Sequence, residues 1–481
     1  MNFSLFRTFC LIRNKWLWGC ILGLILTACG EQSPGEAPLR WEADLALEGG
    51  YLLTMDEQRQ AWPEATLLVK DGTIIALGPS DSLQGQYRAQ TTMDLSGHLL
   101  MPGLVNTHTH LPMTLFRGLA DDLALQTWLQ DFVWPAEAQF MDSSHVRLGT
   151  RLALAELIRG GVTTFNDMYF FAELIAAETK QAGLRALVGE GLLMYPTPNA
   201  ATPAEAFAHA RAFIEQYHSD SLITPTVAPH SPYSCTDSML RAAQALAIEY
   251  GVPLHIHLAE TQREDADLQA RTGLSPTAHL ANLGLIAPGL IAAHGVVLSD
   301  PDIALLQAGG AGIAHCPESN LKLASGIAPV PALRRAGVPV GLGTDGPTSN
   351  NNLSLFDEMS LAARLHKVAT LDPAAMPAEA VVAMATIEGA RVLGLDDRIG
   401  SLAVGKRADL IAIDLQQPHL TPLYSPYSQL VYAAQAADVS HVWVDGRCLM
   451  RARKLLTLDE QAIMQAVRRL AQEIEVEVHQ N

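Results

Sequence analysis

Two histidines of this chain are spaced in a way that suits metal binding. His108 and His110 lie two residues apart in the apolar stretch 102–110, which has the composition of a buried strand. Side chains at positions i and i+2 of a strand point to the same side, so the two imidazoles can converge on one ion. Such a pair also occurs by chance, and further ligands must therefore come from other parts of the chain.

The region after this pair alternates between strand-like and amphipathic helical segments, which is typical of βα units and a parallel sheet. The strand candidates are 103–110, 161–168, 185–193, 223–230, 253–260, 290–298, 310–317 and 338–345. Eight units predict an α/β fold with a TIM-type (β/α)8 barrel rather than an open sheet. Short strands separated by turn signals lie on both sides of the barrel, which predicts a small β-sandwich built from both termini.

The predicted organisation has six segments. They are a lipoprotein-type signal peptide at 1–29, a tether at 30–43, the two parts of the β-sandwich at 44–99 and 401–450, the barrel at 100–400 and a C-terminal helix at 451–481.

Polar side chains gather at the predicted ends of the barrel strands, where enzymes of this fold carry out their chemistry. Seven of the 16 histidines fall there together with two carboxyl groups: His108, His110, His230, His255, His257, His294, His315, Glu260 and Asp345. A lone strand histidine is usually a hydrogen-bonded core residue, and His255 and His315 individually keep that interpretation. Two histidines from strand one, one from strand five and Asp345 would suit Zn²⁺, with Fe²⁺ as the alternative. Such an ion lowers the pKa of a bound water towards roughly 7, which predicts hydrolytic chemistry.

Several stretches, in this order, resemble the amidohydrolase superfamily. They are 106–110, 255–260, His294 and 343–346. The resemblance covers roughly residues 44–450. Four further stretches are similar to the branch of methylthioadenosine/S-adenosylhomocysteine deaminases and chlorohydrolase-like enzymes: 116–122, 134–137, 228–233 and 316–323.

This resemblance implies a role for each matching residue. The implied ligands of a single metal ion are His108, His110, His257 and Asp345. The implied catalytic groups are Glu260 as proton shuttle, Asp345 as acceptor of a proton from water, and His294 as the residue that orients or polarises that water. The implied substrate-binding residues are Glu137 for the ribose hydroxyls, His230, and Glu260.

The implied reaction is the hydrolytic deamination of an adenine nucleoside, with release of ammonia and the hypoxanthine nucleoside. The candidate substrates are 5′-methylthioadenosine, S-adenosylhomocysteine and adenosine. The alternative is another cyclic amine or halide, such as guanine, cytosine or a triazine. The stretch 189–196 holds no arginine to match those that contact the amino-acid tail of S-adenosylhomocysteine in the family.

The chemistry of deamination supports these roles independently. Attack at C6 requires a proton for the ring nitrogen and another for departing ammonia, and a carboxyl group beside the metal can supply both. Glu260 lies three residues beyond His257 at a strand end. Glu137 follows Trp134 and Pro135 in a predicted loop after strand one, where its carboxylate could accept two hydrogen bonds from a diol.

The net charge of −18 argues against nucleic acid as a partner, since such binding depends on neutralising phosphates. The family resemblance implies a small purine nucleoside as the partner. The family resemblance adds the expectation of a homo-oligomer.

The N-terminus differs from the rest of the chain. Three basic residues precede the apolar run 16–28, which is short for a spanning helix and typical of a signal peptide. The sequence 26–29 resembles a bacterial lipobox that ends in Cys29, the predicted site of lipidation. These features predict an exported lipoprotein that contacts the membrane only through its lipid anchor, on the periplasmic side. If the segment is not a working signal, the prediction becomes a cytoplasmic protein.

Overall fold

The computed structural model of the protein describes residues 39–478. The predicted signal peptide, Cys29 and most of the predicted tether lie outside the described residues. The first strand begins at Trp41. None of the helices between residues 39 and 478 combines the length and the apolar character needed to cross a membrane.

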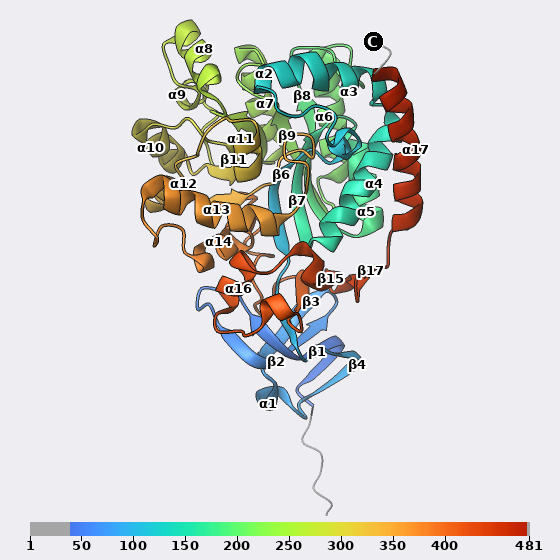
Figure 1. The fold of residues 1–481 in the computed structure, drawn as a ribbon. Helices are drawn as coiled ribbons and strands as arrows, with labels where there is room; N and C mark the ends of the chain where they lie inside the picture. Colours follow the sequence, from blue (N-terminus) through green and yellow to red (C-terminus); the bar gives the residue numbers. More distant parts are fainter. Residues whose placement is uncertain (1–38, 479–481) are drawn as a thin grey trace, which may run out of the picture. The chain divides into compact units, whose positions relative to one another are not determined.

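Eight parallel strands form the central sheet, and each pairs with the next strand along the chain (Figure 1). They are β6 (Leu104–Thr109), β7 (Val162–Tyr169), β8 (Arg185–Leu192), β9 (Ile223–Pro229), β10 (Leu254–Leu258), β11 (Leu290–His294), β12 (Gly312–His315) and β13 (Val340–Leu342). Just beyond β13 the Asp345 N–H donates to the His108 carbonyl at 3.0 Å, which joins the last strand to the first. The predicted TIM-type barrel is confirmed.

Helices on the outside of the barrel connect these strands or follow the last of them. They are α4 (Ser143–Arg159), α5 (Ala172–Ala182), α6 (Pro203–Tyr217), α7 (Asp237–Tyr250), α8 (Gln262–Thr272), α9 (Pro276–Leu283), α10 (Asp300–Gly309), α11 (Pro317–Lys322), α12 (Val330–Arg335), α13 (Leu355–Thr370), α14 (Ala378–Met384) and α15 (Ile387–Val392). Many begin at a side chain that accepts a hydrogen bond from the first turn, such as Asp142 before α4 and Thr261 before α8. The last helix, α17 (Glu460–Val478), packs along α4 (Figure 1).

Strands from both ends of the chain form a second, mixed sheet, shown by the blue and red segments below the barrel in Figure 1. The strands are β1 (Trp41–Leu53), β2 (Ala61–Lys70), β3 (Thr73–Pro79), β4 (Tyr87–Asp94), β5 (His98–Pro102), β14 (Leu410–Asp414), β15 (Val439–Val444), β16 (Arg447–Arg451) and β17 (Lys454–Leu455). Leu47 and Leu67 from the N-terminal strands share a core with Leu410 and Trp443 from the C-terminal strands. The β-structure predicted from both termini is therefore present, as one continuous sheet whose two halves pack together. A short helix, α16 (Pro426–Tyr432), lies between β14 and β15.

A buried ionic group fastens this sheet to the barrel. The Arg185 side chain, at the start of β8, is 1 % exposed and donates to both carboxylate oxygens of Asp409, at 2.7 and 3.2 Å. It also donates to Asp445 at 2.5 Å and to the Ser221 carbonyl at 2.9 Å. All the charges of this group are paired, which is the condition for burying them without a large loss of stability.

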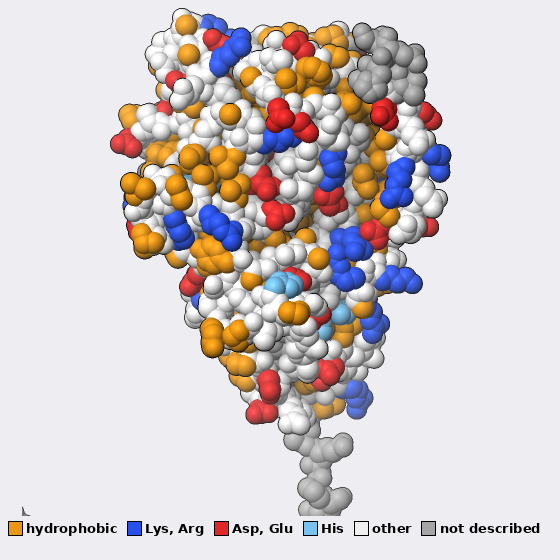
Figure 2. All heavy atoms as spheres, in the orientation of Figure 1, with side chains coloured by type: hydrophobic (Ala, Val, Ile, Leu, Met, Phe, Trp, Pro, Cys, Tyr) orange, Lys and Arg blue, Asp and Glu red, His pale blue; other side chains and the backbone are white. Residues whose placement is uncertain are grey.

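Acidic and basic side chains are interspersed on the face drawn in Figure 2. Within the described residues, charged side chains also form pairs between elements, such as Arg211 of α6 with Glu249 of α7 at 2.6 Å. This face therefore shows no single large patch of one charge.

Candidate active site

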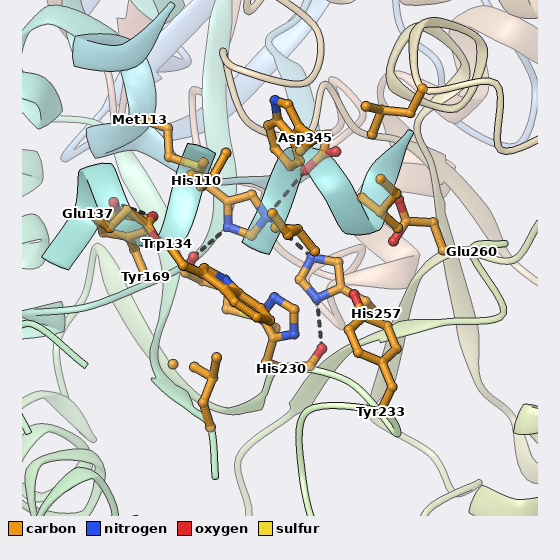
Figure 3. A pocket seen from close by; sticks show the side chains of 18 of the residues that line it. His110, Met113, Trp134, Glu137, Tyr169, His230, Tyr233, His257, Glu260 and Asp345 are labelled. Atoms are coloured by element: carbon orange, nitrogen blue, oxygen red, sulfur yellow. Dashed lines mark hydrogen bonds and ion pairs between the residues drawn. The ribbon is translucent and has the colours of Figure 1, made fainter. Parts of the chain in front are cut away.

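The site lies where the barrel strands end, as their composition predicted (Figure 3). His108 belongs to β6 and His110 follows it directly. His257 belongs to β10, His294 ends β11, and Asp345 lies three residues beyond β13. The barrel thus brings together side chains that are up to 237 residues apart in the sequence.

Asp345 stands between the two histidines of the first strand. Its Oδ1 atom lies 3.2 Å from His108 Nε2 and 3.2 Å from His110 Nε2. The Nε2 atom of His257 is 3.2 Å from that of His110. The four predicted ligand atoms are therefore gathered around one point.

Hydrogen bonds behind the histidines fix which ring nitrogen faces this point. His110 Nδ1 donates to the Met168 carbonyl at 2.6 Å, and His257 Nδ1 donates to the His230 carbonyl at 2.7 Å. A neutral imidazole that donates from Nδ1 keeps a free lone pair on Nε2, the arrangement common to metal-binding histidines. His108 Nδ1 is 2.8 Å from His255 Nε2, and when His108 donates this hydrogen bond its own Nε2 is free in the same way.

These atoms fit a divalent cation. His108 Nε2 is buried and has no hydrogen-bond partner within residues 39–478, although a carboxylate oxygen is close to it. Nitrogen lone pairs and a carboxylate oxygen directed at one point repel each other unless a cation lies between them. Three imidazoles and one carboxylate are a donor set typical of Zn²⁺.

The protonation of these groups follows from burial and from Asp345. Burial lowers the pKa of His108 to about 4, and burial together with His230 lowers that of His257 well below its ordinary value. Burial alone would also lower the pKa of His110, but the contact with Asp345 raises it to about 9. Despite burial, the neighbouring His108 and His110 hold the pKa of Asp345 well below its ordinary range. In the absence of metal, a proton on His110 thus balances the charge of Asp345.

His294 adds a further nitrogen beside the predicted ligands. One ligand atom each from His108, His257, His294 and Asp345 can be chosen so that all four lie within 4.8 Å of one another. His294 Nδ1 donates to Asn320 Oδ1 at 2.9 Å, which leaves its Nε2 free. His294 is therefore placed either to complete the coordination of an ion or to contact a water molecule beside it.

Glu260 lies beside this cluster. Its carboxylate is buried, and Oε2 is 4.0 Å from His294 Nε2. Burial raises the pKa of Glu260 above its ordinary value, and the negative charge of Asp345 raises it further. A carboxyl group with a raised pKa can both donate and accept a proton near neutral pH.

Glu137 lies on the other side of the cluster from Glu260 (Figure 3). The prediction that Glu137 lies in a loop is wrong, because Glu137 belongs to helix α3 (Trp134–Phe140). Pro135 occupies the first turn of α3 directly after the π-helical turn η2 (Trp128–Val133), a wider turn that tolerates the missing N–H. The Tyr169 hydroxyl donates to Glu137 Oε1 at 2.6 Å, which leaves Oε2 for another donor. Burial raises the pKa of Glu137 to about 7, although Tyr169 and His110 act to lower it.

His230 also reaches this pocket, as predicted, from the residue after β9. Its ring centroid lies 4.5 Å from that of His257. Its Nδ1 is 2.8 Å from the Ser234 hydroxyl, and burial lowers its pKa to about 3. His230 is therefore a neutral group available for hydrogen bonding with a ligand.

The remaining wall of the pocket is apolar. It includes side chains from the short helix α2 (Leu125–Thr127) and from η2: Leu125, Trp128, Leu129 and Val133. Met113, Trp134 and Phe170 extend this surface on neighbouring elements. A planar aromatic base with an apolar substituent would complement such a wall.

Several residues that support the site were not predicted. The Ser319 and Ser349 hydroxyls donate to Asp345 Oδ2 at 2.6 and 2.7 Å, and Asn320 accepts from His294. Ser319 and Asn320 belong to the stretch 316–323. The resemblance of this stretch to a family was visible in the sequence, but the roles of its residues were not. Tyr169 could have been noticed as a polar residue at the end of the second barrel strand.

A model of the amidohydrolase family matches residues 99–449, which is more than half of the chain. The chain belongs to the amidohydrolase family. The 5-methylthioadenosine/S-adenosylhomocysteine deaminase of Syntrophobacter fumaroxidans is 48 % identical over 432 residues, which are 90 % of this chain and 98 % of that protein. The 5′-deoxyadenosine deaminase of Methanosarcina mazei is 41 % identical over 439 residues, which are 91 % of this chain and 100 % of that protein.

A solved structure agrees with these sequence relatives. An adenosine deaminase from Xanthomonas campestris with bound zinc superimposes with a TM-score of 0.89 at 41 % identity, over 92 % of this chain and 100 % of that one. The family and these relatives make this chain a hydrolase that acts on carbon–nitrogen bonds, with a His/Asp cluster for a metal ion.

Proposed function

We propose that this protein is a metal-dependent deaminase of adenine nucleosides that converts them to the hypoxanthine nucleosides with release of ammonia. The substrates are 5′-methylthioadenosine, S-adenosylhomocysteine and adenosine. One observation carries the proposal: Glu260 and Glu137 lie on opposite sides of the histidine cluster, as a base at one end and a ribose at the other require (Figure 3). The relatives named for these nucleosides support it.

In the proposed enzyme, His108, His110, His257 and Asp345 hold one divalent ion, and Zn²⁺ suits their donor atoms best. When bound, such an ion supplies Lewis acidity that makes water nucleophilic near neutral pH. The hydrogen bonds on the far side of His110 and His257 keep their Nε2 atoms directed at the ion. The Ser319 and Ser349 hydroxyls hold the second oxygen of Asp345 in the same way.

The proposed reaction requires two protons to reach the departing side of the substrate. Asp345 is unprotonated because its pKa is held low, so it accepts a proton from the attacking water while His294 orients that water. Glu260, whose pKa is raised, gives a proton to the ring nitrogen and later helps transfer one to the amino group. Water and substrate then become ammonia and the hypoxanthine nucleoside, and no other reactant is needed.

The opposite end of the pocket binds the sugar in this proposal. Glu137 accepts hydrogen bonds from the ribose hydroxyls with the oxygen that Tyr169 does not use. His230 contacts the nucleoside between the two ends. The apolar wall around Leu129 and Trp134 favours a substituent such as methylthio at the 5′ carbon.

Measurement of ammonia release tests the proposal. Zinc-loaded protein should release ammonia from 5′-methylthioadenosine, and Glu260→Gln should abolish this release without loss of zinc. Guanine, cytosine and a triazine serve as alternative substrates. If one of these is turned over and the adenine nucleosides are not, the nucleoside assignment is refuted. A Glu137→Ala variant should lose most activity on nucleosides and little on a free base.

We also propose that the protein is exported and anchored to a membrane through a lipid on Cys29. The sequence of residues 1–29 supports this proposal. A Cys29→Ala variant should appear in the soluble fraction of the cell, whereas the wild type should sediment with membranes. Membrane association of the variant would refute lipidation as the anchor.

A homo-oligomer is a further proposal, supported by family membership. Light scattering of the purified protein should give a mass that is a multiple of the mass of one mature chain. A mass equal to that of one chain at micromolar concentration would refute it.

A further inference from the structure

We infer that Glu264 is a positioning residue that holds Glu260 in place by fixing the backbone in front of it. The inference rests on the proposed function, in which Glu260 transfers protons. Glu264 lies in the first turn of α8, and its side chain is buried. It is not among the residues that line the pocket at the histidine cluster, so its burial calls for another explanation.

Both carboxylate oxygens of Glu264 bind the backbone that leads to Glu260. Oε1 accepts from the Ala259 N–H at 3.1 Å, and Oε2 accepts from the Glu260 N–H at 2.7 Å. The helix itself begins at Thr261, whose hydroxyl accepts from the Glu264 N–H at 3.1 Å. A glutamate at this position of a helix commonly returns to the N–H of the capping residue. Glu264 instead reaches past Thr261 to the two residues before it.

The backbone at this point is strained. Ala259 has φ of +52°, the left-handed region that residues with a Cβ atom rarely adopt. Its carbonyl accepts from the Val296 and Val297 N–H groups at 2.9 and 2.8 Å. The strained residue is therefore held on its carbonyl side by the loop that follows β11 and on its amide side by Glu264. Strain of this kind persists only where the surroundings impose it.

The Glu260 carboxylate depends on this backbone for its direction. Across residues 39–478 it makes no hydrogen bond, and the basic nitrogen that comes near it is His294 Nε2, at 4.0 Å. Glu260 enters the pocket directly from the strained turn (Figure 3). If the turn relaxed, the carboxylate would move, and a displacement of about 1 Å at a catalytic group can cost roughly 100-fold in rate.

The test uses the Glu264→Gln variant of the full-length zinc-loaded protein. Glutamine keeps the shape of the side chain but replaces one acceptor by an NH₂ group, which then faces a backbone N–H. We expect kcat for 5′-methylthioadenosine to fall by roughly 10- to 100-fold, while KM and zinc content change less than about twofold. Asp265→Asn is the matched control, because it removes a charge from the same helical turn and should leave kcat unchanged.

A second substitution distinguishes positioning from a general role in stability. Ala259→Gly removes the steric cost of the left-handed backbone, so the turn no longer depends on Glu264. Combined with Glu264→Gln, it should recover at least about tenfold of the lost kcat, and alone it should change kcat less than about threefold. Thermal unfolding of each variant shows whether a change in kcat merely follows a loss of fold.

Two outcomes overturn the inference. One is a Glu264→Gln variant with kcat within about twofold of the wild type. The other is a double variant, Ala259→Gly with Glu264→Gln, whose kcat is no higher than that expected from multiplying the effects of the two single substitutions. The Glu260→Gln variant is measured beside them. If it remains active, the proposed function fails; if it is inactive while Glu264→Gln is fully active, only the positioning role of Glu264 fails.

Discussion

Replacing Glu137 by glutamine should weaken catalysis and stabilise the fold, by an amount that depends on pH. In the folded protein, burial raises the pKa of Glu137 from 4.5 to about 7. The fold therefore binds this proton more tightly than the unfolded chain does. The resulting contribution to stability is fully present below pH 4.5 and is lost as the pH rises through about 7. Glutamine does not titrate, so its contribution stays constant.

The size of the effect follows from these values. The difference between 4.5 and about 7, at about 1.4 kcal/mol for each pH unit, amounts to about 3 kcal/mol above pH 7. At about 2 cal/mol/K per residue, the unfolding entropy of roughly 440 residues converts this free energy into about 3 °C of melting temperature. The Glu137→Gln variant should thus melt about 3 °C higher than the wild type at pH 8 and nearly equally at pH 5.

Thermal unfolding at these two pH values measures the effect, and the Tyr169→Phe variant provides a control of opposite sign. Removal of the Tyr169 hydroxyl leaves the buried carboxylate without its donor, which should lower stability at pH 8 by about 1–3 kcal/mol. The activity of Glu137→Gln on 5′-methylthioadenosine should fall roughly 100-fold, since two charge-assisted hydrogen bonds to the ribose are lost. A variant that melts lower than the wild type at pH 8, or equally higher at both pH values, would refute the reasoning.

Three further predictions concern the metal and the fold. Chelation should abolish activity, and added Zn²⁺ should restore it. Below about pH 9, zinc must displace a proton from His110, so the zinc affinity measured by competition should fall about tenfold for each pH unit. Ser319→Ala should lower zinc affinity by roughly 10- to 100-fold, because Asp345 Oδ2 loses a donor at 2.6 Å; unchanged affinity would contradict this support. Arg185→Met leaves the Asp409 carboxylate buried without its cation. Denaturant unfolding should therefore show a free energy of unfolding lower by about 3–5 kcal/mol, with little change in kcat. A stability equal to that of the wild type would count against the buried ion group.

The barrel could be predicted because its strands have a simple sequence signature. Strands of a parallel sheet are buried on both faces, so they appear as nearly continuous apolar runs. In β10, between Leu254 and Leu258, the histidines that interrupt such a run stand out for this reason. The same contrast identified His108 on β6 and Asp345 after β13, and the structure brings them together.

The surroundings of the ligands could not be predicted in this way. Tyr169 and Glu137 are 32 residues apart, and Ser319 and Asp345 are 26 apart, on elements whose contact depends on how the loops fold over the barrel. No periodicity in the sequence records such a contact. The helix that carries Glu137 was missed for a local reason, since Pro135 argues against a helix unless the preceding turn is known to be a π-helix.

Glu264 combines a position that is recognisable in the sequence with contacts that are not. It belongs to the first turn of α8, but its carboxylate binds the backbone that precedes the helix. Thr261 caps α8, and Glu264 stands three residues later, where a glutamate commonly returns to the N–H of the capping residue. Only the left-handed Ala259 reveals that the carboxylate is used on the strand side of the helix. The cap is the hydrogen bond from the Glu264 N–H to Thr261, whereas the Glu264 carboxylate binds the N–H groups of Ala259 and Glu260. Their effects on stability and on kcat can be separated only by removing the strain itself, as Ala259→Gly does.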